Sequence, residues 1–195
     1  MKKLLFIFCI AFLLTGCTSK DNATEVDTTE VTITEEETTE DASSPYVLTF
    51  EAKTIDGETI TSDIFAKSEL TMINVWATYC NPCLMEMPYL GEIANAYNQS
   101  EFQMIGIVSD VTEEGKADDI QTAKDLIKET KADYPHLLLS QSLYTNLVGA
   151  VEAVPTTFFI NQKGEMLGYI TGANTKEGWE EIINDVREKM EQQSK

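Results

Sequence analysis

The stretch "NVWATYCNPCLMEMP", residues 74–88, carries two cysteines at the point where an apolar run gives way to a helical pattern. The run that leads into it, "LTMINVWAT", is apolar almost throughout, which is typical of a strand buried on both faces of a sheet. A helix is expected to follow from about Pro82 to Asn98. Cys80 and Cys83 are therefore expected where a buried strand ends and a helix begins.

Three kinds of site use cysteines at this spacing. A structural zinc site needs four ligands, usually thiolates and imidazoles, and beyond residue 17 the chain offers only these two thiols and one histidine, His136. A structural disulfide across so short a loop would contribute roughly 2 kcal/mol through loop entropy, which is the low end for disulfides. A redox-active pair is the third kind of site, and the chemistry of the position favours it.

The start of a helix is a place where a cysteine becomes reactive. Free backbone N–H groups and the helix dipole stabilise a thiolate there. Cys80, at the edge, is placed to attack a disulfide, and Cys83, one turn into the helix, is placed to resolve the mixed disulfide. Pro82 between them is tolerated in a first helical turn and stiffens it. We therefore expect a thiol-disulfide exchange site.

The amino-terminal segment has the pattern of an export signal. Two lysines precede an apolar run of 11 residues, Leu4 to Leu14, which is too short to cross a bilayer that needs roughly 20. The string from Leu14 to Cys17, "LTGC", resembles the lipobox of bacterial lipoproteins, in which the cysteine is lipidated and becomes the first mature residue. A plain cleaved signal and a short membrane anchor are the alternatives. Residues 1–16 are thus expected to be a lipoprotein signal peptide, with Cys17 anchoring the protein on the outer face of the cell membrane.

A threonine- and glutamate-rich segment, residues 17–44, follows the signal. After Cys17 it carries nine acidic residues and one lysine and no aromatic residue. Such a segment cannot bury enough surface to offset the entropy of ordering, so we expect a disordered tether. In residues 45–195, 24 acidic residues stand against 11 basic ones, a net charge of −13. That charge repels phosphate backbones and argues against nucleic-acid binding.

Residues 45–195 have the pattern of one α/β domain. Hairpin signals occur at Asp56-Gly57 and at Lys163-Gly164. Between them the expected elements are strands at "FQMIGIVSD" and "HLLLS" and helices at "ADDIQTAKDLIKET" and "SLYTNLVGA". A last helix is expected from Asn174, capped by that residue together with Glu177. Strands that first alternate with helices and then end in an antiparallel pair predict a mixed central sheet with helices on both faces.

The sequence resembles the thioredoxin fold and, within it, the membrane-anchored TlpA/ResA-type thiol-disulfide oxidoreductases. The matching stretches are "VWATYCNPC", "CLMEMP" and "AVPTTFFINQKGEMLGYITG", beside the lipobox and tether, and the likeness covers the chain from about residue 46 to its end. Tyr79 departs from the pattern, because most relatives have tryptophan there. The resemblance implies a thioredoxin domain with an amino-terminal β-hairpin and, from Val111 to Ala150, the extra strand-helix unit of this subgroup.

The resemblance also implies roles for residues around the cysteine pair. Pro155 would be a cis proline packed beside the cysteines, and the backbone of Val154 would pair with a bound client as an added strand. Without the resemblance, Pro155 would be an ordinary strand-edge proline. Trp76 and Tyr79 are expected to flank the site as core and rim residues, and both, together with Pro82, are candidates for contact with substrate.

Glu86 is the most informative acidic residue. It follows Cys83 by three positions and matches the acid of the family pattern Cys-x-x-Cys-x-x-Glu-x-Pro, which in relatives lies beneath the cysteines and helps to move protons. Physically, a nearby carboxylate disfavours the thiolate and can accept the proton of the resolving cysteine. The alternative for Glu86 is a solvated helix glutamate. His136, by contrast, is expected to pack at a strand start and to take no part in chemistry.

Charge around the pair predicts the direction of electron flow. A strong oxidant holds its reactive thiol as a low-pKa thiolate, and cationic neighbours would favour that thiolate. No Lys, Arg or His occurs between Leu70 and Gly115, so we expect a reductase. Separately, we expect it to be a monomer that works through its disulfide, with no metal and no other cofactor. The resemblance implies a membrane thiol transporter of the CcdA/DsbD type as electron donor. Its clients would be apocytochrome c, methionine sulfoxide reductase or other oxidised extracytoplasmic proteins.

Three other functions stay open. The first is an oxidase of the same fold that forms disulfides. The second is a peroxidase, which needs a Thr-x-x-Cys placement and an arginine that polarises the peroxide. Here Thr78 lies two residues before Cys80, and the sole arginine is Arg187 on the last expected helix. The third is a non-catalytic lipoprotein that only binds partners or a solute.

Overall fold

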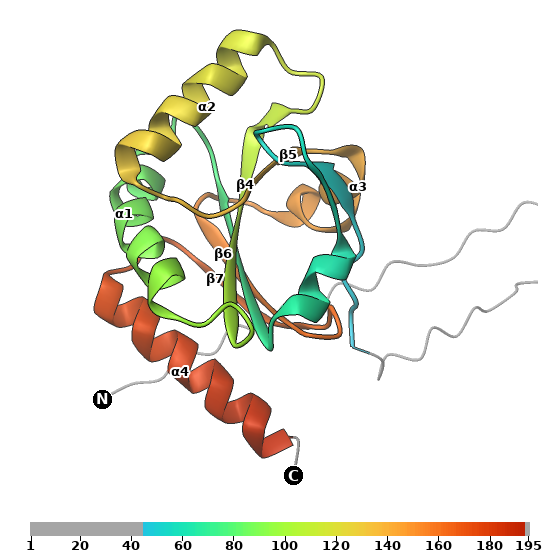
Figure 1. The fold of residues 1–195 in the computed structure, drawn as a ribbon, viewed down its shortest axis with the longest axis vertical. Helices are drawn as coiled ribbons and strands as arrows, with labels where there is room; N and C mark the ends of the chain where they lie inside the picture. The colour runs from blue at the N-terminus through green and yellow to red at the C-terminus, as the bar shows by residue number, and fades with distance from the viewer. Residues whose placement is uncertain (1–44, 194–195) are drawn as a thin grey trace, which may run out of the picture. The chain divides into compact units, whose positions relative to one another are not determined.

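The computed structural model describes residues 45–193, so residues 1–44 and 194–195 lie outside the description (Figure 1). The predicted signal peptide 1–16, the lipidated Cys17 and the tether 17–44 are outside the described residues and stay predictions. In chain order the elements are β1 (Glu51–Lys53), β2 (Thr59–Thr61), the 3-10 helix η1 (Ser62–Lys67), β3 (Leu70–Trp76), α1 (Asn81–Ala96), β4 (Phe102–Thr112), α2 (Ala117–Thr130), β5 (His136–Leu139), α3 (Gln141–Asn146), the 3-10 helix η2 (Val148–Ala150), β6 (Thr156–Asn161), β7 (Met166–Thr171) and α4 (Lys176–Gln193).

Five strands form the central sheet, in the order β5-β4-β3-β6-β7. The pairs β3–β4 and β4–β5 are parallel, whereas β6 runs antiparallel to both β3 and β7. Helices cover both faces of this sheet (Figure 1). The mixed sheet predicted from the order of elements is therefore confirmed.

The middle strand, β3, decides where the cysteines lie. All its residues are buried, as its continuous apolar sequence predicts. Its last residues pair with the neighbouring strands on both sides, Trp76 with Val108 of β4 and Val75 with Thr156 of β6. The segment that leaves the end of β3 is consequently flanked by the end of β4 on one side and the start of β6 on the other.

Two apolar clusters form the core, one on each face of the sheet. The first joins β3 to helices α1, α2 and α4 through residues such as Leu90, Ala123 and Trp179. The second joins the sheet to the β1–β2 hairpin, η1 and α3 through residues such as Phe65 and Leu143. Because α1 is bound to the first face, its amino-terminal cysteines are held against the end of β3.

Both predicted hairpins are present. Strands β1 and β2 pair antiparallel around Gly57, and strands β6 and β7 pair around Gly164. Both glycines have positive φ, 93° and 82°, a region that residues with a Cβ rarely adopt. The chain enters the domain beside the second turn, where Val47 bridges to Glu165. Within residues 45–193, no helix combines the length and apolar content needed to span a bilayer.

The start of α4 differs from the expectation. The predicted cap, Asn174 with Glu177, is wrong, because the helix begins one residue later than that pair requires. Thr175 Oγ1 accepts a hydrogen bond from the backbone N–H of Gly178 at 3.1 Å, and the Thr175 carbonyl accepts from Trp179. Thr175 therefore caps α4, and the backbone N–H of Asn174 is left to bind elsewhere.

Candidate redox site

Cys80 and Cys83 form a disulfide at the amino end of α1, with their Cα atoms 5.3 Å apart. Cys80 is the N-cap residue, and its Sγ accepts a hydrogen bond from the backbone N–H of Cys83 at 3.3 Å. Pro82 occupies the first turn, as predicted. Cys83 is fully buried, whereas Cys80 is 5% exposed. Of the two, Cys80 is the residue that reaches the surface, which is what an attacking thiol needs.

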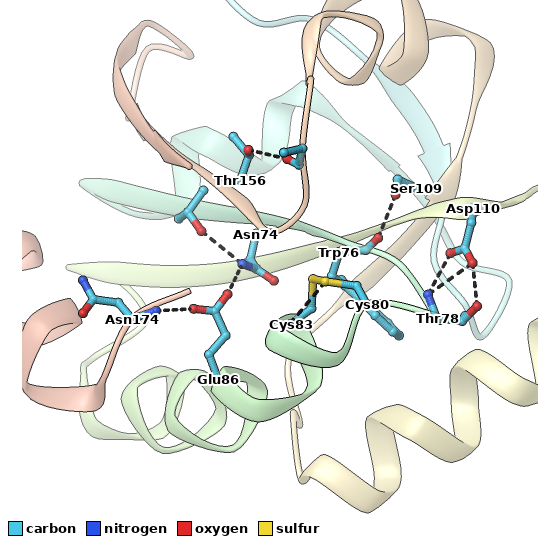
Figure 2. The surroundings of a disulfide bond; sticks show 12 residues. Asn74, Trp76, Thr78, Cys80, Cys83, Glu86, Ser109, Asp110, Thr156 and Asn174 are labelled. Carbon is cyan, nitrogen blue, oxygen red and sulfur yellow. Dashed lines mark hydrogen bonds between the residues drawn. A yellow bond between two sulfur atoms is a disulfide. The ribbon is translucent and has the colours of Figure 1, made fainter. Parts of the chain in front are cut away.

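The segment before Cys80 is anchored to the end of β4. The Asp110 carboxylate accepts hydrogen bonds from the Thr78 backbone N–H at 3.0 Å and from Thr78 Oγ1 at 2.5 Å (Figure 2). Ser109 Oγ donates to the Trp76 carbonyl at 2.9 Å. These contacts fix the chain between β3 and the disulfide. Sequence reasoning missed both anchors, although a Ser-Asp pair closing a buried strand is a usable signal.

The residues expected to contact substrate divide into two groups. Tyr79 is 75% exposed and Pro82 is exposed, so both lie on the rim of the site. Trp76 is fully buried and its Nε1–H donates to His136. The assignment of Trp76 to the core is therefore confirmed, and its buried ring is not accessible to a substrate in this state.

Glu86 is buried beneath the site rather than solvated. It is 1% exposed and lies one helical turn after Cys83 (Figure 2). Its carboxylate accepts three hydrogen bonds, from Asn74 Nδ2 at 3.1 Å, from the backbone N–H of Asn174 at 2.9 Å and from Trp179 Nε1 at 3.0 Å. Burial raises the pKa of this carboxyl above its ordinary value, although the three donors act in the opposite direction. The alternative of a solvated helix glutamate is thus ruled out.

Asn74 on β3 is the second buried polar residue of the site, and sequence reasoning missed it. Its Nδ2 donates to Glu86 and also, at 3.0 Å, to Thr157 Oγ1 on β6. Its amide oxygen has no partner among the described residues. In Figure 2 the Asn74 side chain lies between Glu86 and the disulfide. Asn74 therefore links the carboxyl on α1 to the two central strands.

The peptide bond between Val154 and Pro155 is cis, as the resemblance implied. Thr156, the next residue, pairs with Val75 near the end of β3, which brings this bond to the cysteine end of the sheet. Pro155 is buried. Val154 packs against the core cluster that contains both cysteines.

His136 is packed at the start of β5, which confirms the structural expectation for it. It is 2% exposed. Its Nδ1 accepts from Trp76 Nε1 at 3.1 Å, so Nε2 must carry the proton that it shares with the Ala132 carbonyl at 3.0 Å. The ring stacks on Tyr134 with a centroid distance of 4.4 Å. Burial lowers the pKa of His136 to about 4, which keeps the ring neutral.

The electrostatic surroundings of the disulfide contain few cations. Residues 70–115, 137–162 and 164–175, which supply strands β3, β4, β6 and β7, contain no Lys, Arg or His, and exposed Lys116 follows the first of these segments at the start of α2. Lys176, which follows the third segment, is bound to Glu92 with Nζ 2.6 Å from the carboxylate. Within residues 45–193, no group of three or more His, Cys, Asp or Glu is arranged to hold a metal ion.

Comparison with known proteins gives concordant results. The AhpC/TSA family matches residues 46–167, which is more than half of the chain. The thiol-disulfide oxidoreductase ResA of Bacillus thuringiensis subsp. konkukian is 28% identical over 137 residues, which cover 70% of this chain and 74% of that protein. The sporulation thiol-disulfide oxidoreductase A of Bacillus subtilis is 29% identical over 136 residues, covering 68% of this chain and 78% of that protein.

A solved structure shows the same architecture. The crystal structure of a thiol:disulfide interchange protein of the thioredoxin family from Chlorobium tepidum matches with a TM-score of 0.60 and 22% identity, covering 73% of this chain and 97% of that chain. The expected thioredoxin fold is therefore confirmed.

Proposed function

Because the chain belongs to the AhpC/TSA family and is a thiol-disulfide oxidoreductase of the ResA type, we propose that it reduces disulfides in client proteins outside the cytoplasm. The active form for this work is the Cys80–Cys83 dithiol, and the described disulfide is the state reached after one turnover. Electrons pass through the two sulfurs, so no other cofactor is needed.

The reaction takes two exchange steps. The Cys80 thiolate attacks one sulfur of a client disulfide, which breaks that bond, forms a mixed disulfide and releases the first client sulfur as a thiolate that takes up a proton. Cys83 then loses its proton, attacks Cys80 Sγ and releases the second client sulfur. Two electrons and two protons reach the client, and Cys80–Cys83 is oxidised. Glu86, one turn beyond Cys83 and with a raised pKa, is the group suited to accept the Cys83 proton.

One observation carries the choice of direction, namely the lack of cationic side chains in the segments that supply strands β3, β4, β6 and β7. A thiolate at Cys80 gains the helix start and the Cys83 N–H, but no ion pair. Buried Glu86 disfavours a second negative charge nearby. A dithiol that is little stabilised as a thiolate gives up its electrons readily.

The redox partners and the location complete the proposal. We infer that the protein is tethered to the cell membrane through lipidated Cys17 and that its domain acts as a monomer on the extracytoplasmic face. A dithiol on a membrane thiol transporter of the CcdA/DsbD type would re-reduce the Cys80–Cys83 disulfide. Apocytochrome c and methionine sulfoxide reductase are the client types that the resemblance to the TlpA/ResA-type proteins suggests.

Measurement of the reduction potential tests the direction. The protein is equilibrated with thiol buffers of known potential, and the dithiol fraction is read by alkylation. We expect a value near thioredoxin's, about −270 mV, whereas a value near that of DsbA, about −120 mV, would make the protein an oxidase.

A trapping experiment tests the exchange chemistry and identifies the clients. Cys83→Ala leaves Cys80 able to attack but removes the resolving thiol, so clients should stay joined to Cys80 through mixed disulfides. Cys80→Ala is the matched control and should trap none. Reductase activity equal to that of the unmodified chain in Cys80→Ala would instead support a non-catalytic lipoprotein with a contaminating activity.

The peroxidase alternative gains no support from the site. Arg187 lies over the Tyr97 ring and binds Glu101, with Nη2 3.3 Å from the carboxylate. Tyr97 follows the carboxyl end of α1, about 24 Å along the helix from the cysteines by the usual rise per residue. The Thr78 hydroxyl is bound to Asp110. Peroxide consumption by the purified protein without an added thiol reductant would reverse this conclusion.

A further inference from the structure

The surface around the disulfide is apolar at its centre. Tyr79 and Met85 are 75% and 68% exposed, and exposed Pro82 lies between them in the sequence. They lie immediately before and within the first turns of α1, the helix that carries both cysteines. We call Tyr79, Pro82 and Met85 the cystine face. Large apolar side chains exposed beside a reactive group favour contact with another molecule.

Two exposed acidic residues lie on or next to the strands that flank β3, the strand that leads to the cystine face. β4 and β6 are the two neighbours of β3 in the sheet. Asp110 lies on β4 past the point where Trp76 pairs, and its carboxylate binds Thr78, two residues before Cys80. Glu152 precedes β6, two residues before Val154, which packs on the cysteine cluster. In the order of the sheet, the two acidic residues therefore lie on opposite sides of β3, which leads into the segment that carries Cys80.

No cation offsets these two carboxylates. Both residues are exposed, and neither forms an ion pair with another described residue. The segments around them, residues 70–115 and 137–162, contain no Lys, Arg or His. The domain as a whole is also strongly acidic, with a net charge of −13 over residues 45–195. These charges favour the approach of a cationic segment over that of an anionic one.

We propose that the cystine face selects oxidised client segments in which the cystine is flanked by lysine or arginine. The apolar side chains receive the part of the client next to its sulfurs, while Asp110 and Glu152 attract cationic residues on either side. Clients with acidic residues beside the cystine are repelled. This inference rests on the proposed reductase function and names the substrate class of the same site.

Three cystine peptides of one length test the charge preference. They differ only in the residues that flank the two cysteines, which are lysine, serine or glutamate. The full-length chain, reduced beforehand, is mixed with each peptide at about 0.01 M and about 1 M salt, where the Debye length falls from about 30 Å to about 3 Å. At low salt we expect the lysine peptide to be reduced about tenfold faster than the glutamate peptide, and we expect near-equal rates at high salt.

Variants at the site distinguish the effect of these two carboxylates on the reduction rates from the effect of the net charge of the chain. The double variant Asp110→Asn with Glu152→Gln should lower the lysine-to-glutamate rate ratio about threefold. The control is Glu188→Gln with Glu191→Gln, which removes the same charge from exposed positions near the far end of α4 and should leave the ratio unchanged. Asp110→Asn removes a partner of Thr78 and can disturb the loop before Cys80. The single variant Glu152→Gln leaves that loop intact and should lower the lysine-to-glutamate rate ratio by a smaller factor.

A further variant tests the apolar part. Tyr79→Ser should slow the reduction of all three peptides alike, without changing their ratio. A slowing confined to one peptide would contradict an apolar contact shared by all clients.

The outcomes distinguish this inference from the function beneath it. Equal rates for the three peptides at low salt, or an equal fall in the ratio for the site variant and the α4 control, would overturn the inference and leave the reductase intact. Failure to reduce any peptide, the serine peptide included, would overturn the proposed function and the inference with it.

Discussion

Two buried titratable side chains, Glu86 on α1 and His136 on β5, are held in opposite ways. Glu86 only accepts hydrogen bonds, and it accepts three. The donors favour the carboxylate while burial favours the acid, so the pKa of Glu86 is raised and both protonation states have support. His136 uses one ring nitrogen as acceptor and the other as donor. A second proton on His136 would displace the N–H of Trp76, which has no other described partner.

The difference teaches what makes a buried group able to exchange protons. Depth of burial alone does not decide it, because both residues are nearly inaccessible. The partners decide it. When the hydrogen-bond partners and burial favour the same protonation state, as for His136, the residue stays in that state. When the partners favour the charged form and burial favours the neutral form, as for Glu86, the residue can gain and lose a proton. By this criterion Glu86 suits the proton transfer that we propose for it, and His136 is part of the scaffold.

The largest effect on stability is expected from a substitution that displaces the His136 ring. Gly106 on β4 lies against the imidazole, and a Cβ there would come within 2.6 Å of Cε1. Both ring nitrogens are bound, so the ring cannot move away. We expect Gly106→Ala to lower the free energy of unfolding by about 3 kcal/mol, measured by urea denaturation. The control is Gly168→Ala on β7, where an added Cβ meets nothing within 4 Å. Equal losses in the two variants would show that the imidazole is free to shift.

The next effect concerns proton exchange at Glu86. Glu86→Gln keeps the size of the side chain but removes the base that accepts the Cys83 proton. We expect the resolution of the mixed disulfide to slow about 100-fold near pH 7. The deficit should shrink above about pH 8.5, where a thiol ionises without help. Rapid mixing with a cystine peptide, followed by acid quench, measures the step. Exposed Glu92→Gln is the control, and a deficit that is constant with pH would remove the proton-transfer role.

The pH dependence of stability sharpens the comparison further. His136 has a native pKa of about 4 against an ordinary 6.5. Between these two pH values the unfolded chain binds more protons than the native chain, so the contribution of His136 to stability falls as pH falls. The pKa of Glu86 is raised in the native state, so the native chain binds more protons just above the ordinary value, and its contribution falls as pH rises. The two slopes have opposite signs.

Variants should separate these slopes. Between about pH 6.5 and 4.5, His136→Gln should flatten the acid-side loss of stability and Glu86→Gln should steepen it, each by up to about 1 kcal/mol per pH unit. Urea titrations across this pH range measure both. The same slope in the two variants would mean that neither group has a shifted pKa.

The smallest effect is expected at Tyr134, which stacks on His136. Its hydroxyl is buried and has no partner among the described residues, and burial together with the charge of Glu86 raises its pKa. Tyr134→Phe keeps the ring and removes an unsatisfied polar atom. We expect the free energy of unfolding to rise or to change by less than about 1 kcal/mol. A loss above about 2 kcal/mol in thermal unfolding would reveal a partner for the hydroxyl.

Much of the fold could be predicted because its signals are local. The apolar run of β3, the turn glycines at 57 and 164, and the helical stripes each depend on neighbours in sequence. Glu86 was found through its match to the family pattern Cys-x-x-Cys-x-x-Glu-x-Pro, whereas the bare sequence left a solvated glutamate open. The start of α4 was placed wrongly because Asn174 and Thr175 are both good N-caps, and the choice depends on where the Asn174 N–H binds.

The missing parts of the site were those assembled over long sequence separations. Glu86 binds Trp179, which is 93 residues away, and Asp110 binds Thr78 across 32 residues. The burial of Trp76 was predictable, because it ends an apolar run typical of a strand buried on both faces. Its hydrogen bond to His136, 60 residues away, was not, because that contact depends on the pairing of strands far apart in the sequence.

The entry point of the chain into the domain has a mechanical consequence. Leu48 and Val47 join the sheet beside Gly164 and Glu165, at the turn of the last hairpin, whereas the sulfurs lie where β6 begins. The chain upstream of Tyr46 therefore joins the domain at the end of the sheet opposite the cysteines. If the proposed lipid anchor holds the protein, an orientation with this end toward the membrane directs the disulfide away from it. The domain would then have to turn to bring the disulfide to the proposed electron donor in the bilayer.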